Sequence, residues 1–164
     1  MNFQATRLRP AEWLLGAASA ALLVDVFVPS WYAMAGGHGV NGWQALAVLR
    51  YLIVGCALVG LATWWVQATR RSPAIPVCLT VVTLFVSSIL VLTLIWRVLI
   101  DPPTSGPGSG VDAGAYIGLF LAALVANASY RSLRVDGIRA ADGPQQIERL
   151  SLDARPDAGA SLRS

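Results

Sequence analysis

Hydrophobic residues in this chain gather into four long runs, separated by short polar or Gly/Pro-rich stretches. The runs cover about residues 11–28, 43–66, 74–100 and 113–130. Each approaches the roughly 20 residues that an α-helix needs to cross about 30 Å of hydrocarbon. Because the apolar residues are continuous rather than alternating, helices are favoured over the strands of a membrane barrel. The pattern therefore predicts an all-α, four-transmembrane-helix bundle.

The composition agrees with a membrane protein. Of the 164 residues, 55% are hydrophobic and 13% are charged, whereas a soluble domain carries about a quarter charged residues. The net charge of +3 comes from twelve arginines and no lysine. These arginines flank the apolar runs, which suits orientation in a membrane better than a phosphate-binding face. We therefore expect membrane lipids, and no nucleic acid, as partners.

The connections between the runs differ in charge. Connections 29–42 and 102–112 contain no arginine, and ten of the twelve arginines lie in the other three polar segments: Arg7, Arg9, Arg70, Arg71, Arg131, Arg134, Arg139, Arg149, Arg155 and Arg163. The positive-inside rule then places both termini in the cytoplasm of a cell bounded by an inner (plasma) membrane. Aromatic residues near the run ends suggest belts at the two interfaces: Trp31, Tyr32, Trp43, Tyr51, Trp64 and Trp65.

This topology divides the chain into three parts. Residues 1–10 form a cytoplasmic N-terminal segment, and residues 11–131 form the transmembrane domain. Residues 132–164 have few large apolar residues and no sustained periodicity, which predicts a disordered cytoplasmic tail.

An alternative reading of the N-terminus is a cleavable signal peptide. Arg7 and Arg9 precede an apolar stretch, and Ala33-Met34-Ala35 resembles a cleavage site. The acid Asp25 within the stretch, and bulky Trp31 and Tyr32 near the cleavage region, favour retention instead.

The two remaining arginines lie inside apolar runs, near two acids. A helix rises about 1.5 Å per residue, so the depth of each charge below the outer face of the membrane follows from its position in the run. Asp25 and Arg97 lie about 5 Å deep, Arg50 lies about 10 Å deep, and Asp101 lies at the face itself. Intramembrane charges are costly and usually face a partner. We expect these four residues to form one charge-balanced layer. It acts either as an ion-paired clamp between spans or as a pocket for an anionic ligand or lipid headgroup.

Two further patterns predict helix packing. Gly114, Gly118, Ala122 and Ala126 follow each other at four-residue spacing. They form a ridge of small residues, which lets a neighbouring backbone approach, within the bundle or in a homodimer. Thr80, Thr83 and Ser87 share a stripe that can donate hydrogen bonds across helices or back to its own carbonyls.

Candidate chemistry is sparse. Cys56 and Cys78 form no CxxC pair, and His38 is the single histidine, so neither a disulfide nor a metal site is indicated. No phosphate-binding glycine loop, zinc motif or nucleophile elbow occurs. We expect no catalytic residue, no metal and no cofactor.

Four segments of the chain resemble a known family. They are Asp25-Val-Phe-Val-Pro-Ser-Trp-Tyr32, Gly42-Trp-Gln-Ala-Leu46, Trp96-Arg-Val-Leu-Ile-Asp-Pro-Pro103 and Gly114-Ala-Tyr-Ile-Gly-Leu119. This pattern resembles uncharacterised small four-span integral membrane proteins of actinobacteria, over about residues 10–131. The resemblance implies fold and location and supplies no activity. Pro-Trp-Tyr is contiguous in that family; here Ser30 intervenes, so the turn after the first span is expected to differ.

The sequence predicts a non-enzymatic structural or accessory membrane component that binds a partner protein or lipid, with a homo-oligomer as a further possibility. A small oligomeric transporter or channel is the first alternative. A membrane-embedded enzyme is the second, and it would need a titratable base in a polar pocket that the sequence does not supply.

Overall fold

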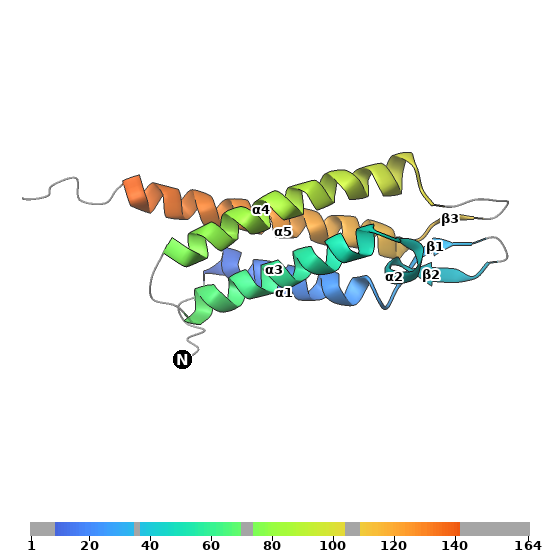
Figure 1. The fold of residues 1–164 in the computed structure, drawn as a ribbon, viewed down its shortest axis with the longest axis horizontal. Coiled ribbons are helices and arrows are strands. Elements are labelled where there is room, and N and C mark those ends of the chain that lie inside the picture. The colour runs from blue at the N-terminus through green and yellow to red at the C-terminus, as the bar shows by residue number, and fades with distance from the viewer. Residues whose placement is uncertain (1–8, 35–36, 70–73, 104–108, 142–164) are drawn as a thin grey trace, which may run out of the picture.

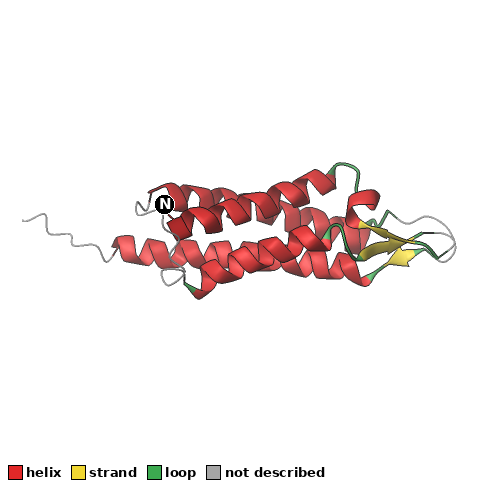
Figure 2. Cartoon of the chain, turned by 90° about the horizontal axis from the view of Figure 1, so that it is seen from below, coloured by secondary structure: helices red, strands yellow, loops and turns green. Residues whose placement is uncertain are grey.

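A computed structural model describes residues 9–34, 37–69, 74–103 and 109–141. Four long helices form an elongated bundle, and a small β-sheet lies at one end of it (Figure 1). The helices are α1 (Pro10–Asp25), α3 (Leu49–Thr69), α4 (Ala74–Ile95) and α5 (Ala113–Ala141). The start of α1 and the end of α5 lie together at the opposite end (Figure 2). We call these two ends the sheet end and the terminal end.

Three of the long helices are long and apolar enough to cross a membrane. They cover Leu49–Thr69, Val77–Ile100 and Ala113–Val135. The chain is thus mostly helical, as the hydropathy pattern predicts, and has the character of a membrane protein. With 16 residues, α1 is shorter than the roughly 20 that a full crossing requires.

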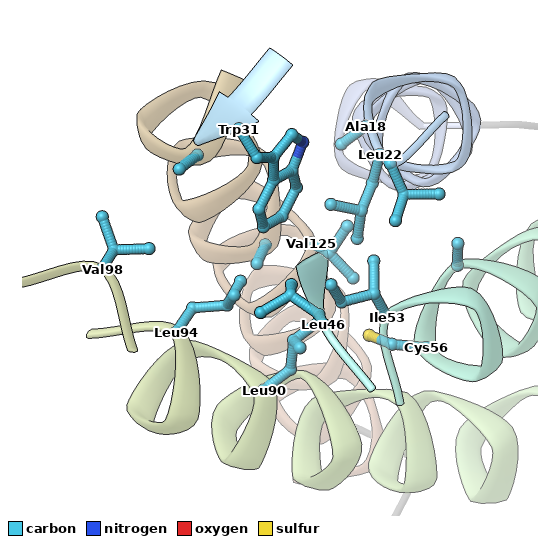
Figure 3. Packing of buried hydrophobic residues seen from close by; sticks show 14 of the residues in the cluster. Ala18, Leu22, Trp31, Leu46, Ile53, Cys56, Leu90, Leu94, Val98 and Val125 are labelled. Carbon is cyan, nitrogen blue, oxygen red and sulfur yellow. The ribbon is translucent and has the colours of Figure 1, made fainter. Parts of the chain in front are cut away.

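The four helices pack in a ring in which each contacts two neighbours: α1 lies against α3 and α5, and α4 lies against the same two. Leu22, Ile53, Leu90 and Val125, one from each helix, meet in the buried core (Figure 3). Large apolar side chains also cover the outside, among them Leu58, Phe85, Leu92 and Phe120. An apolar exterior of this kind is typical of a surface in contact with lipid.

Helices α1 and α3 approach closely at two glycines. A Cβ on Gly60 would collide with the hydroxyl of Ser19, and a Cβ on Gly16 would lie 2.7 Å from the Trp64 ring. Both glycines are buried. In lipid there is no hydrophobic driving force between helices, so their association depends on close packing. Small residues at a helix crossing allow the two backbones to pack tightly.

The sheet end is closed by three short antiparallel strands in the order β2-β1-β3. These are β1 (Ser30–Ala33), β2 (Gly39–Asn41) and β3 (Gly110–Val111). Ser30 pairs with Asn41 and Tyr32 with Val40, so β1 has one extra residue, Trp31, at a bulge. In a regular strand, consecutive side chains point to opposite faces. A bulge changes the direction of a side chain, which explains why the consecutive residues Trp31 and Tyr32 are both buried.

Several expectations from the sequence need correction. The fold is not purely α-helical, because the sheet joins the first and third connections. Trp31 and Tyr32 belong to the core and not to an interfacial belt. The second run is interrupted after the short helix α2 (Gly42–Ala45), and α3 begins only at Leu49.

The predicted C-terminal boundary also shifts. Helix α5 continues to Ala141, ten residues past the expected end of the transmembrane domain at 131. The continuation carries Arg134 and Arg139 on a helix. Residues 1–8 of the predicted N-terminal segment and residues 142–164 of the predicted tail lie outside the described residues.

Candidate functional site

Asp25, the last residue of α1, is buried, with 5% of its surface exposed. The indole N–H of Trp31 donates a hydrogen bond to the Asp25 backbone oxygen at 2.9 Å. Among the described residues, nothing donates a hydrogen bond to the Asp25 carboxylate oxygen Oδ2. A Cβ on Gly118 would lie 2.7 Å from that oxygen, so the carboxyl group fits between α1 and α5 because position 118 is glycine.

Arg50 lies in the first turn of α3 and is held by aromatic residues. Its guanidinium carbon is 4.9 Å from the ring centroids of both Trp43 and Tyr51. The group also donates hydrogen bonds to the Trp43 carbonyl at 3.3 Å and the Tyr51 hydroxyl at 3.1 Å. Such cation–π contacts stabilise a partly buried arginine. Because α3 begins at Leu49, Arg50 is at the start of the helix, not two turns inside it.

Arg97 and Asp101 form the ion pair that their spacing predicts. The Arg97 Nη1 donates to Asp101 Oδ2 at 2.8 Å and to the Asp101 backbone oxygen at 3.0 Å. The two side chains are 35% and 64% exposed, so this is a surface pair. Arg97 lies on a π-helical turn, η2 (Trp96–Ile100), and Asp101 follows directly after it. The backbone N–H of Asp101 donates a hydrogen bond to the Trp96 carbonyl at 2.9 Å.

Tyr32 joins the central strand to this turn. Its hydroxyl donates to the Arg97 backbone oxygen at 3.5 Å, where the end of a helix leaves carbonyls without helical partners. Burial raises the pKa of the Tyr32 hydroxyl to about 12, while the Arg97 charge opposes that rise. Tyr32 therefore remains a neutral donor at any physiological pH.

The four predicted charged residues thus share the sheet end but do not form one network. Within the described residues, Arg97 pairs with Asp101, Arg50 lies against aromatic rings, and the Asp25 Oδ2 has no hydrogen-bond partner. Trp31 and Tyr32, which the sequence placed in a belt, are the residues that connect this end of the bundle.

The predicted ridge of small residues faces three different surroundings. A Cβ on Gly114 would lie 2.5 Å from the Ser30 carbonyl oxygen, and one on Gly118 would collide with the Trp31 ring. Ala122 lies in the core, and Ala126 lines a groove between α4 and α5. The two glycines of the ridge therefore contact strand β1, and Gly118 also contacts Asp25 at the end of α1.

A polar layer lies inside the bundle nearer the terminal end. The hydroxyls of Thr63 and Thr83 are 2.8 Å apart, and both residues are buried. The Gln67 amide donates to Thr80 at 3.2 Å and to Ser132 at 3.5 Å. The stripe of Thr80 and Thr83 was visible in the sequence. Gln67 was not singled out, although a lone amide at the end of an apolar run is a usable signal.

Metal-binding groups do not gather among the described residues: no set of three or more His, Cys, Asp or Glu side chains is placed to hold an ion. Cys56 is buried and Cys78 is exposed on the apolar exterior. No protein-family model matches the chain, and no curated protein or solved structure is significantly similar to it.

Proposed function

We propose that this chain is a four-span protein of the inner (plasma) membrane, with both termini cytoplasmic, that acts as a non-enzymatic accessory component binding a partner membrane protein or lipid. Its membership of the small four-span actinobacterial family belongs to the same proposal. The arginine distribution supports the orientation. Ten of the twelve arginines fall in the polar segments on the side of the termini.

Helix α1 serves as the fourth span. Its 16 residues rise about 24 Å, and the apolar residues Val26, Phe27 and Val28 extend that length at the sheet end. Leu15, Ala18 and Leu22 of α1 belong to the buried core. Cleavage after a signal peptide would remove this part of the core, so the packing favours retention of the first span.

The proposed accessory role is supported by the way side chains fill the interior of the bundle. Trp31 and Tyr32 fill the sheet end, and apolar side chains from all four long helices fill the middle. The hydroxyls of Thr63 and Thr83 face each other, and the Gln67 amide donates to the Thr80 hydroxyl. A conducting pore needs a continuous polar path, whereas this bundle offers its outer surface for binding.

Reconstitution tests this proposal. Liposomes containing the full-length protein should release neither trapped ions nor a trapped anionic dye faster than empty liposomes. Native mass spectrometry of the membrane-extracted protein should report a bound lipid or a defined protein partner, with an intact mass that includes the first span. Flux through the native protein would overturn the accessory role in favour of a transporter or channel.

A further inference from the structure

A basic pocket lies at the terminal end, where α1 begins beside α5. It has a volume of about 510 Å³ and is lined by Arg9, Pro10, Ala11, Asn127, Tyr130, Arg131, Arg134 and Val135. The four α5 residues from Asn127 to Arg134 follow the spacing i, i+3, i+4, i+7, so they share one face of the helix. Three arginines therefore line one concave site: Arg9, which caps α1, and Arg131 and Arg134 of α5.

The described residues that line this pocket include three arginines and no acid. The neighbouring Glu12 carboxylate accepts the Arg9 backbone N–H at 2.9 Å and so acts as part of the helix cap. Arg131 and Arg134 are exposed. Guanidinium groups bind phosphate oxygens through paired hydrogen bonds, so an anionic phosphate group matches this site.

An apolar groove adjoins the basic pocket. It has a volume of about 480 Å³ and lies between α4 and α5, lined by Leu84, Ser88, Val91, Leu92, Ala123, Ala126, Asn127 and Tyr130. Asn127 and Tyr130 line both cavities. From Leu84 to Leu92 the groove follows about 12 Å of helix. The two cavities thus adjoin at Asn127 and Tyr130: one is lined by arginines, and the other is mainly apolar and lies nearer the middle of the bundle.

We propose that this composite site binds one anionic phospholipid of the cytoplasmic leaflet. Its phosphate lies among Arg9, Arg131 and Arg134, and one acyl chain lies in the groove between α4 and α5. The inference rests on the proposed orientation, which puts the terminal end in the cytoplasm. Basic pockets between membrane helices on that side are known to favour anionic headgroups, and tyrosine prefers the same interfacial depth.

The first experiment measures lipid retention by native mass spectrometry after delipidation and addition of defined lipids. The native protein should retain one phosphatidylglycerol in preference to phosphatidylcholine. Each interfacial arginine contributes roughly fivefold, so the double variant Arg131→Gln/Arg134→Gln should weaken retention roughly 30-fold. The matched double variant Arg155→Gln/Arg163→Gln removes the same charge from the C-terminal segment and should retain the lipid.

The second experiment tests the acyl groove without changing charge. Ala126→Phe places a ring in the groove and should lower phosphatidylglycerol retention at least several-fold. Ala62→Phe adds the same ring on α3, where the side chain is exposed, and should have no effect. Thermal unfolding of each variant in detergent confirms that it is folded.

The outcomes separate this inference from the proposed function. Equal retention of phosphatidylglycerol and phosphatidylcholine, or equal losses in both arginine variants, overturns the lipid site and leaves the accessory role intact. Displacement of the lipid by soluble glycerol phosphate alone would assign the pocket to a free phosphate ester and overturn the acyl groove. Flux through the liposomes overturns the accessory role without affecting lipid retention.

Discussion

Trp31 packs its indole ring against the bare backbone of Gly118, at the point where the sheet meets α5. A Cβ on Gly118 would collide with this ring and would also lie 2.7 Å from the Asp25 carboxylate. The ring in turn fixes the end of α1 through its hydrogen bond to the Asp25 backbone. The glycine therefore allows β1, α1 and α5 to meet.

Gly118→Ala should displace the Trp31 ring and loosen the sheet end. Overpacking of a tight site costs about 1–3 kcal/mol, so the thermal midpoint in detergent should fall by several degrees. Tryptophan fluorescence should shift toward longer wavelength as Trp31 becomes exposed. An unchanged midpoint and spectrum would mean that Trp31 does not occupy this space.

Gly60→Ala should separate α1 from α3. The added Cβ meets the Ser19 hydroxyl and lies 3.1 Å from the Ser19 Cβ, with an expected cost of about 1–3 kcal/mol. Gly55→Ala on the same helix is the matched control, because nothing lies within 4 Å of its Cβ position. That control should be neutral or slightly stabilising, since alanine favours helix. Equal effects of both substitutions on the unfolding midpoint would contradict the crossing at Gly60.

Arg50 and Arg97 should differ in their contribution to stability. Arg50→Leu loses contacts with two aromatic rings and a hydrogen bond to the Trp43 carbonyl, which should cost about 1–2 kcal/mol. Arg97→Gln breaks an exposed ion pair worth less than about 1 kcal/mol. Chemical or thermal unfolding in detergent provides the comparison. If Arg50→Leu keeps full stability but loses a co-purifying ligand, Arg50 belongs to a binding site instead.

Tyr32 should make stability depend on pH in the alkaline range. Its pKa rises from 10.0 to about 12 on folding, chiefly through burial. A pKa raised in the folded state favours the neutral form, so this stabilisation is complete below pH 10 and is lost as the pH rises toward about 12. The unfolding midpoint of the native protein should fall over this window. Tyr32→Phe cannot ionise, so parallel pH profiles for both proteins would refute the role of Tyr32.

Hydropathy predicted the long helices well where the chain supplies clear boundaries. The third run, 74–100, coincides with α4 and η2 together, because prolines flank it on both sides. The second predicted run, 43–66, begins before α3 does. Apolar residues continue through Leu46–Val48, where the helix is interrupted, so hydropathy does not show the break. Hydropathy reports burial in lipid or protein and contains no signal for a change in backbone direction.

The candidate site was less predictable, for a geometric reason. Counting residues along a helix gives the depth of Asp25, Arg50 and Arg97 but not their angle around the bundle axis. Residues at similar depth can therefore face different neighbours, as Arg50 does with Trp43 and Tyr51. The three strands were missed because two to four residues each are too few to establish an alternating pattern.

The pairing of β1 with β3 also constrains the order of assembly in the membrane. Strand β1 follows the first helix, whereas β3 directly precedes the last one. During synthesis, β1 can pair with β3 only after Gly110 and Val111 have been made. Trp31 and the face of α1 that packs on α5 therefore stay incompletely covered until α5 has formed. Closure of the bundle thus joins an early and a late segment of the described chain.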